Sequence, residues 1–437
     1  MMPGDPYLLV RAGALYATVV LTLVAWAVRR PTARDMSGGM LACLWNLPTL
    51  MALNFAAAHY GWWTFDAHGG LFLGVPIDFL LAWAWLWGVV PVMAFPKLPL
   101  GLVAGVALAF DLALMPAMSP VVRLGPAWLV GDAIGLFIAF IPGQLLARWT
   151  MRDAHLVSRV ALQVITFGGL MLFLLPASII EGSGTAWTSP LARPHWQLSL
   201  IVQILAIPAL TGLSAVQEFT TRGAGTPVPF DPPRRLVMTG LYAYLRNPMQ
   251  LSAVALLLLL GAALQNVWIA IGGVMAHIYS AGLAGWDEDE DLRRRFGADW
   301  DTYRRGVRSW LPRLRPWHAT NGSPSRLYVA ESCGMCSEVG RWFQRRRASA
   351  LLIIPAETHP SRALTRITYE SGDGTHAVSG VEAVARALEH VHLGWACAGC
   401  LLRLPIVCQS AQLLVDASGG EPRLLRYRPT ADESVSR

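Results

Sequence analysis

Long apolar segments recur along this chain of 437 residues and set the strongest limit on its fold. The hydrocarbon core of a bilayer is about 30 Å thick, so a helix of roughly 20 apolar residues can cross it. Segments close to this length lie at residues 8–28, 40–58, 71–95, 100–118, 128–147, 158–180, 196–216, 249–264 and 267–284. The sequence therefore predicts an all-α, polytopic membrane bundle with about nine transmembrane helices.

The overall composition agrees with a membrane location. Hydrophobic residues make up 54% of the chain and charged residues only 14%, with a mean hydropathy of +0.43. In soluble proteins about a quarter of the residues are charged. The first apolar segment is long enough to span the bilayer and lacks a small-residue cleavage site behind it, so we expect a retained helix and not a signal peptide.

The basic character of the chain, with a formal charge of +7, is explained by its loops. The arginines lie in short segments at helix ends, with no interleaved aromatic residues of the kind that stack on nucleic-acid bases, so no nucleic-acid partner is predicted. Positive charges favour the cytosolic side. They occupy alternate loops, which predicts a multi-pass protein of the cell membrane with its N-terminus outside and the residues after 285 in the cytosol.

The two last apolar segments are joined by Gln265 and Asn266 alone. So short a connection predicts an antiparallel helical hairpin, a little short for a full span.

Several short motifs surround this hairpin in a fixed order. They are Gly225-Thr-Pro227, Gly240-Leu-Tyr-Ala-Tyr-Leu-Arg-Asn-Pro-Met249, Asp287-Glu-Asp-Glu-Asp-Leu-Arg-Arg-Arg-Phe-Gly297, Tyr303 and Trp310-Leu-Pro312. Their order and spacing, over about residues 205–316, resemble the isoprenylcysteine carboxyl methyltransferase and phospholipid N-methyltransferase superfamily. The resemblance implies a membrane enzyme that uses S-adenosylmethionine as its cofactor.

The resemblance also implies site residues. Arg246 and Glu288 are expected to be catalytic, and Leu241 and Gln250 depart from the family pattern, which has Pro and commonly Tyr there. The residues implied to bind the cofactor are Gly240, Tyr242, Tyr244, Arg246, Asn247, Pro248, Glu288 and Asp289.

Elementary chemistry suits these residue types. Methyl transfer from a sulfonium is an in-line displacement, so the protein mainly has to position donor and acceptor and exclude water. An arginine can bind a carboxylate through two parallel hydrogen bonds, and an acidic group can face an amine or hydroxyls. The alternative is that Arg246-Asn-Pro248 is only the start of a helix and 287–291 an acidic first turn favoured by the helix dipole.

From about residue 316 the composition becomes that of a soluble protein. A linker at 317–326 precedes a segment at 327–418, and a polar tail at 419–437 is predicted to be disordered. The run 327–330 has strand character, Cys333-Gly-Met-Cys336 opens a helical pattern, and a further helix is expected near 381–392. We expect a small α/β, thioredoxin-like domain.

The pair Cys333 and Cys336 is predicted to be a redox site, because a helix N-terminus lowers the pKa of a leading thiol. The segment 327–416 resembles the DCC thiol-disulfide oxidoreductase family, although Ala330-Glu-Ser-Cys333 replaces the usual Asp-Gly-x-Cys. The acid that normally precedes the thiol is therefore absent or displaced to Glu331. Two alternatives are a zinc site that adds Cys397 and Cys400, and buried thiols that only pack. No metal is predicted.

Residues 1–160, a transmembrane bundle of unassigned role, contain Asp78, Asp111 and Asp132 within apolar segments. An acid in lipid costs about 2–3 kcal/mol or more, so such groups either line a polar cavity or lie near the interface.

Two functions follow. The first is a methyltransferase core at 161–316 that acts on a membrane lipid or other lipophilic acceptor, or on a thiol or carboxyl group. The second is a membrane-anchored thiol-disulfide oxidoreductase that is served by a cytosolic thiol reductant and whose bundle binds a lipid or quinone.

Overall fold

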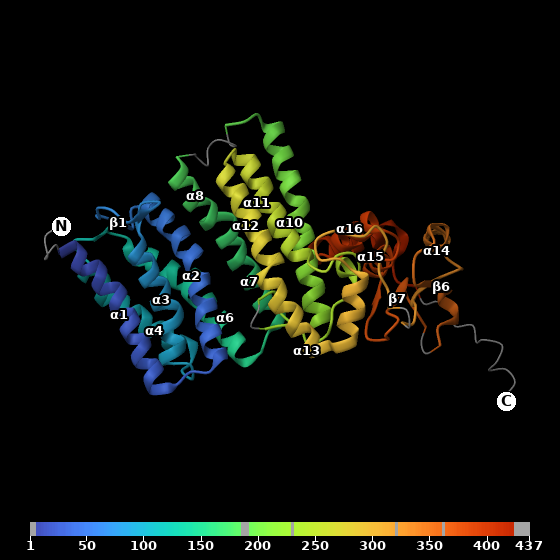
Figure 1. Cartoon of the computed structure of the whole chain (residues 1–437), viewed down its shortest axis with the longest axis horizontal. Helices are drawn as coiled ribbons and strands as arrows, with labels where there is room; N and C mark the ends of the chain where they lie inside the picture. Colours follow the sequence, from blue (N-terminus) through green and yellow to red (C-terminus); the bar gives the residue numbers. More distant parts are fainter. Residues whose placement is uncertain (1–5, 185–191, 229–230, 320–321, 361–362, 424–437) are drawn as a thin grey trace. The chain divides into compact units, whose positions relative to one another are not determined.

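The computed structural model describes residues 6–184, 192–228, 231–319, 322–360 and 363–423. It is mostly helical (Figure 1), and the described residues contain eight helices that are long and apolar enough to cross a membrane. The prediction of a polytopic helical membrane protein is confirmed. The described residues fall into two compact units. The first comprises residues 6–184 and the described part of 226–232. The second comprises residues 192–225 and the described residues from 233 onward.

The first unit consists of apolar helices that carry short strands at their ends. β1 (Trp63–Phe65) pairs antiparallel with β4 (Val122–Leu124), and β2 (Leu71–Phe72) with β3 (Val75–Pro76). The helices are α1 (Pro6–Arg29), α2 (Ala33–Tyr60), α3 (Ile77–Ala94), α4 (Leu100–Ala117), α5 (Trp128–Gly135), α6 (Ile141–Arg152), α7 (Leu156–Gly169) and α8 (Leu175–Ser183), with π-helical turns joining α5 to α6 and α7 to α8.

Two boundaries in this unit differ from the sequence prediction. α2 begins at Ala33 and not near residue 40, because Thr32 and Asp35 form a reciprocal capping box. The segment expected to start a helix at residue 71 forms a two-stranded turn, and α3 begins only at Ile77. Leu73 and Gly74 adopt positive φ angles there, which ends any continuous helix.

The three acids of the first unit have different surroundings. Asp78 forms an ion pair with Arg11 of α1 at 2.7 Å. Asp111 of α4 accepts a hydrogen bond from the indole of Trp87 at 3.2 Å. Asp132 of α5 is fully buried, and neither of its carboxylate oxygens has a hydrogen-bond partner among the described residues.

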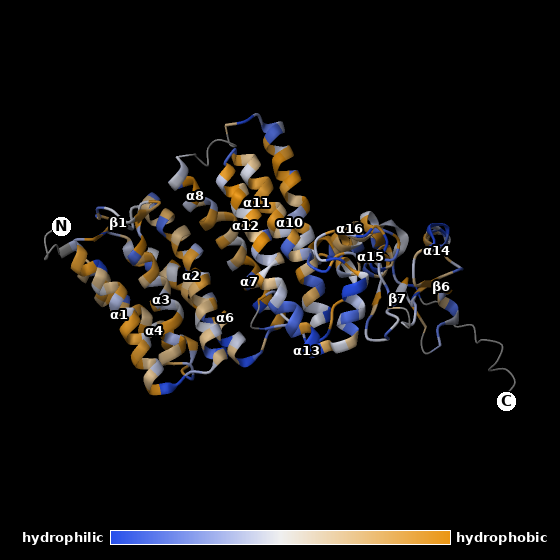
Figure 2. Ribbon diagram, in the orientation of Figure 1, coloured by the Kyte–Doolittle hydropathy of each residue, from blue (hydrophilic) through white to orange (hydrophobic). Residues whose placement is uncertain are grey.

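The second unit begins with three apolar helices, which Figure 2 shows as predominantly hydrophobic: α10 (His195–Gly223), α11 (Pro248–Leu264) and α12 (Val267–Ala281). The hairpin prediction is confirmed: Gln265 ends α11 in a left-handed conformation, and Asn266 caps α12 by accepting hydrogen bonds from the backbone of Trp268 and Ile269. α11 has 17 residues. At 1.5 Å per residue it is about 26 Å long, a little short for a span.

α13 (Leu283–Gly306) is hydrophilic and doubles back on itself. Gly297 interrupts it with φ +52° and ψ −124°, a conformation that residues with a Cβ rarely adopt. The two halves therefore face each other, and Trp300 donates a hydrogen bond from its indole to Asp289 at 3.0 Å. This turn brings Trp300 next to the acidic run at 287–291.

The C-terminal part of the second unit is an α/β segment around a four-stranded sheet. The strand order is β6-β5-β7-β8, with β5 and β6 parallel and the other neighbours antiparallel. The elements are β5 (Ser325–Val329), α14 (Gly334–Arg346), β6 (Leu351–Pro355), β7 (Thr368–Glu370), β8 (Ala377–Ser379), α15 (Val381–Leu388), α16 (Leu393–Leu402) and α17 (Pro405–Val415). The expected strand at 327–330 and the helix after Cys333 are present; the tail from residue 424 lies outside the described residues.

A buried ion-pair network joins α10 to this segment. Glu218 of α10 accepts hydrogen bonds from Arg386 and from Arg403, both at 2.7 Å. Glu389 pairs with Arg403 at 2.7 Å and with Arg386 at 3.4 Å. All four side chains are at most 7% exposed, so the two carboxylates and two guanidinium groups compensate one another away from water.

Gly240 packs directly against this network, and we expect Gly240→Ala to destabilise the second unit. Its φ is +60°, and an added Cβ would lie 3.1 Å from Glu218 and 3.3 Å from Arg403. Strain of this kind costs about 1–3 kcal/mol. Thermal unfolding in detergent should show a lower midpoint for G240A than for G334A, since Gly334 has open space around it. Equal midpoints would contradict this account.

Candidate functional site

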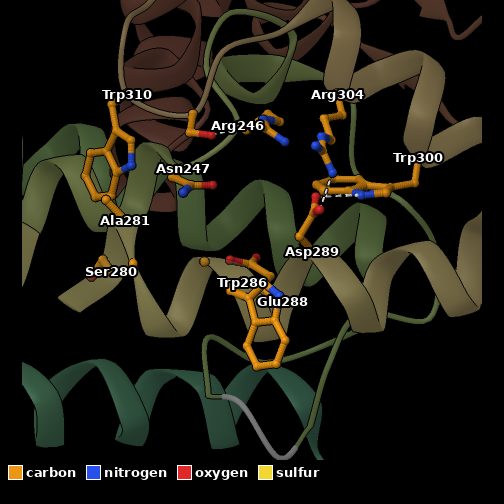
Figure 3. A pocket seen from close by; sticks show the side chains of 13 residues that line it. Arg246, Asn247, Ser280, Ala281, Trp286, Glu288, Asp289, Trp300, Arg304 and Trp310 are labelled. Carbon is orange, nitrogen blue, oxygen red and sulfur yellow. Dashed lines mark hydrogen bonds and ion pairs between the residues drawn. The ribbon is translucent and has the colours of Figure 1, made fainter. Parts of the chain in front are cut away.

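A cavity lies where the start of α11, the end of α12 and both halves of α13 meet (Figure 3). It encloses about 250 Å³, and about 670 Å³ when its open mouth is included. Its lining residues are Arg246, Asn247, Ser280, Ala281, Gly282, Gly285, Trp286, Glu288, Asp289, Trp300, Arg304, Ser309 and Trp310.

Arg246 is held in the wall of this cavity by several contacts. Its backbone N–H donates to the carbonyl of Arg308 at 3.0 Å, and its guanidinium donates to Ser309. The guanidinium carbon lies 5.4 Å from the centre of the Trp300 ring, within the range of a cation–π contact. Its Nε–H is buried and has no hydrogen-bond partner among the described residues. Burial lowers the pKa of the guanidinium, but arginine stays charged at neutral pH.

The two adjacent acids of α13 have different roles. Asp289 stabilises the fold, because its carboxylate accepts hydrogen bonds from Trp300, Arg293 and Arg304. Glu288 is exposed and makes no hydrogen bond or ion pair with the described residues. Figure 3 shows Arg246, Asn247 and Glu288 directed into the same space. A guanidinium and a free carboxylate therefore share one cavity.

Not all residues that the resemblance implied for cofactor binding line this cavity. Arg246, Asn247, Glu288 and Asp289 do. Gly240, Tyr242, Tyr244 and Pro248 are buried elsewhere.

These four residues shape the backbone around the site. The carbonyl of Tyr242 accepts a hydrogen bond from Tyr303 at 2.8 Å. The Tyr244 hydroxyl donates to the carbonyl of Glu389 at 2.9 Å, and burial raises the pKa of this phenol. Pro248 occupies the first turn of α11, where its missing N–H costs nothing. This packing, together with Gly240 beside Glu218, positions Arg246.

Sequence reasoning missed several lining residues. Trp300 and Arg304 follow the Gly297 turn and reach the cavity only because α13 folds back. Trp286 directly precedes the acidic run and is 70% exposed. Trp310 was noted only as part of a motif. The available signal was the density of tryptophan and arginine after Gly285 in a charged helix.

The cavity lies at one end of the apolar helices of its unit. Ser280, Ala281 and Gly282 close α12, and exposed apolar side chains continue past them at Leu283 and Trp286. Tryptophan is enriched at the boundary between lipid and water. The cavity thus lies at the end of α12, next to exposed apolar side chains that continue into α13.

Cys333 and Cys336 lie together at the start of α14, with Cys333 as its N-cap residue. Hydrogen bonds from the backbone and thiol of Cys336 lower the pKa of Cys333. Burial and the neighbouring Cys333 raise the pKa of Cys336 to about 12. The two thiols therefore differ, as a nucleophilic and a resolving thiol do.

The acid expected near this pair comes from Glu357 and not from Glu331. Glu357 follows β6 and accepts hydrogen bonds from the backbone of Glu331 at 3.3 Å and of Ser332 at 3.2 Å. It also accepts from the Ser332 hydroxyl at 2.9 Å. It fixes the turn that leads into Cys333, and a separation of 24 positions hid it from sequence inspection.

The second cysteine pair has a different environment. Cys397 and Cys400 of α16 pack against Ala215, Leu241 and Tyr242. No group of three or more His, Cys, Asp or Glu side chains in the described ranges could hold a metal ion. The alternative of a zinc site built from both cysteine pairs is therefore not assembled there.

Comparison of the chain with protein-family models, curated proteins and solved structures finds no match in any of the three.

Proposed function

We propose that this protein is an integral membrane methyltransferase that transfers a methyl group from S-adenosylmethionine to a lipophilic acceptor. The observation that supports it most is the convergence of Arg246 and Glu288 on one cavity, although two apolar helices separate them in sequence. The hairpin brings the start of α11 and the residues after α12 to the same end, and the reversal of α13 at Gly297 completes the cavity around both side chains.

The residues present fit S-adenosylmethionine. Within the described residues, the Arg246 guanidinium has a free N–H for a carboxylate, and Glu288 has a free carboxylate for an amine or for ribose hydroxyls. Trp286 and Trp310 offer flat surfaces for a purine. Ligand pockets usually measure about 300–1,000 Å³, and this cavity measures about 250 Å³ without its mouth and about 670 Å³ with it. S-adenosylmethionine would therefore fill the cavity and extend into its mouth. When bound, the cofactor supplies an electrophilic methyl group on a sulfonium.

The protein's own residues would act mainly by positioning. Arg246, held by Ser309 and Trp300, orients a carboxylate without moving, because its side chain is already packed. The tryptophans exclude water from the inner part of the cavity. If the acceptor is a neutral hydroxyl or amine, Glu288 is the group near enough to take its proton; a thiolate or carboxylate acceptor needs no base.

The mouth of the cavity favours an acceptor from the membrane. Trp286 is exposed at the mouth and Leu283 next to it is 72% exposed. A lipid or a lipophilic small molecule can reach such an opening sideways from the bilayer, with its polar end at the water boundary. On the charge pattern of the loops this boundary is the cytosolic one.

A binding measurement tests the proposal directly. Purified protein in detergent should bind S-adenosylmethionine in isothermal titration calorimetry, and membranes supplied with the methyl-tritiated compound should yield labelled lipid extract. Glu288→Ala should abolish the lipid label, and Glu290→Ala should not, since Glu290 is exposed and outside the cavity lining. Absence of any binding to the native protein would remove the proposal.

A second activity is favoured by the cysteine geometry. We propose that Cys333 and Cys336 carry out thiol-disulfide exchange with a cytosolic thiol reductant, in a thioredoxin-like domain. The strand–helix–strand unit β5–α14–β6, with the cysteines where the helix begins, supports this interpretation. The Cys333 thiolate would attack a disulfide, and Cys336 would then resolve the mixed disulfide.

We expect Cys333 to be alkylated at a lower pH than an ordinary thiol. Only the thiolate reacts, so a lowered pKa shifts the rate profile to lower pH, and a pKa of about 12 leaves Cys336 unreactive near neutrality. Iodoacetamide labelling followed by peptide mass spectrometry at several pH values measures both profiles. Cys408, whose pKa burial raises, serves as an internal control. Equal profiles for Cys333 and Cys408 would contradict the redox assignment.

A further inference from the structure

The exposed face of α17 is apolar, the reverse of what a helix on the surface of a soluble domain shows. Ile406, Leu413 and Leu414 are 81%, 71% and 69% exposed, and Val407 is exposed beside them. At 100° per residue these four side chains lie on one face. A helix on the surface of a soluble domain normally turns such a face inward.

The polar side of α17 is the side that contacts its own domain. Gln412 accepts a hydrogen bond from the backbone of Val381 at 2.8 Å and donates to Asp416 at 2.7 Å. Arg366 donates to the same carboxylate of Asp416 at 2.9 Å. These contacts fix the rotation of the helix, so the apolar face points away from the domain.

The position of α17 relative to α10 indicates what covers this face. Exposed apolar side chains on α10 continue from Trp196 to Leu213. At 1.5 Å per residue they cover about 26 Å, close to the thickness of a bilayer core. Leu213 therefore marks the region where α10 leaves the hydrocarbon.

α16 is attached to α10 immediately after that point. Ser214 donates a hydrogen bond to the carbonyl of Cys400 at 3.3 Å, and Gln217 donates to the carbonyl of Arg403 at 2.8 Å. α17 begins two residues later and is bent from α16 by 86°. The first turn of α17 thus starts at the level of the membrane surface.

We propose that α17 lies in the membrane interface, with Ile406, Val407, Leu413 and Leu414 inserted among the lipid chains. Helices of this kind bury their apolar face about 5–10 Å into the boundary between headgroups and acyl chains. The C-terminal segment is then held to the bilayer at α17 as well as through α10. This proposal does not depend on the methyltransferase assignment.

Photocrosslinking in the full chain tests this placement. Benzoylphenylalanine is introduced at Leu413 or Ile406, and the protein is reconstituted in vesicles of phosphatidylethanolamine and phosphatidylglycerol with a tritiated phospholipid. Ile207 of α10, 68% exposed, is the reference for lipid contact. Glu338 of α14, whose side chain is 76% exposed, is the reference for water contact.

We expect lipid adducts at 413 and 406 comparable to those at 207 and at least tenfold above those at 338. A level at 413 equal to that at 338 overturns the proposal, and so does a crosslinked dimer. Because a substituted chain can misfold, the native chain provides a second readout: a membrane-partitioned diazirine should modify peptides covering 405–415. Unmodified peptides there, with α10 modified, would equally overturn it.

Discussion

Replacing Arg246 by alanine is expected to weaken binding of S-adenosylmethionine about 100-fold. The guanidinium has a buried Nε–H without a partner in the described part of the chain and is fixed by Ser309 and Trp300, so it is prepared to bind a carboxylate. A hydrogen bond to a charged group contributes about 1.5–3 kcal/mol, and 1.4 kcal/mol corresponds to a factor of ten. Calorimetric titration of the purified variant measures the change.

The matched control is Arg294→Ala. The Arg294 side chain is 68% exposed, and among the residues that the structure describes it pairs only with Glu290, at 3.8 Å. It does not line the cavity. Its removal should change neither binding nor stability measurably. Arg246→Lys should recover part of the affinity, since it keeps the charge but loses the planar pair of donors. If the Arg246→Ala variant has the same unfolding temperature as the native protein and binds the cofactor with the same affinity, the assigned role of Arg246 is wrong.

Replacing Glu218 by alanine is expected to loosen the C-terminal segment from α10 by about 3–5 kcal/mol. The change leaves Arg386 and Arg403 buried, and Glu389 is then the only carboxylate among the described residues that pairs with these two positive charges. Removal of one partner from a buried ion pair has a cost of this size, because the remaining charge cannot reach water. Hydrogen exchange of the α15 and α16 amides in detergent should become roughly 100- to 4,000-fold faster.

Further variants separate charge imbalance from lost packing. Glu290→Ala removes an exposed carboxylate from an i,i+4 pair and should change the exchange rates little. Glu218→Met combined with Arg403→Met removes one charge of each sign and leaves Arg386 paired with Glu389. The double variant should therefore exchange more slowly than Glu218→Met alone. If the increases in exchange rate caused by Glu218→Met and by Arg403→Met simply add in the double variant, charge imbalance is not the cause of the faster exchange.

Much of the membrane architecture was predictable because it depends on local properties. A continuous apolar segment can satisfy its backbone in lipid only as a helix, so its length and position are visible in the sequence. The turn at Gln265 and Asn266 was predictable for the same reason, since both residues act on their immediate neighbours. The start of α3 was missed because positive φ angles at Leu73 and Gly74 override an apolar pattern.

The candidate site was predictable in part. Arg246, Asn247, Glu288 and Asp289 were identified by motif and line the cavity. Tyr242 and Tyr244 belong to the same motif but point into packed interiors, which spacing along a short irregular segment does not reveal. Trp300 entered the site through the reversal at Gly297, and only the tertiary fold shows which side chains that reversal brings together.

The sequence by itself determined that this protein is a helical membrane protein with a polar C-terminal segment, because hydropathy acts along the chain and needs no distant partner. The tertiary structure decided that Arg246 and Glu288 share a cavity, that Glu218 is neutralised by arginines 168 and 185 positions away, and that α17 turns its apolar face outward. Each of these depends on contacts between segments far apart in the chain, whose energies arise only when folding brings them together.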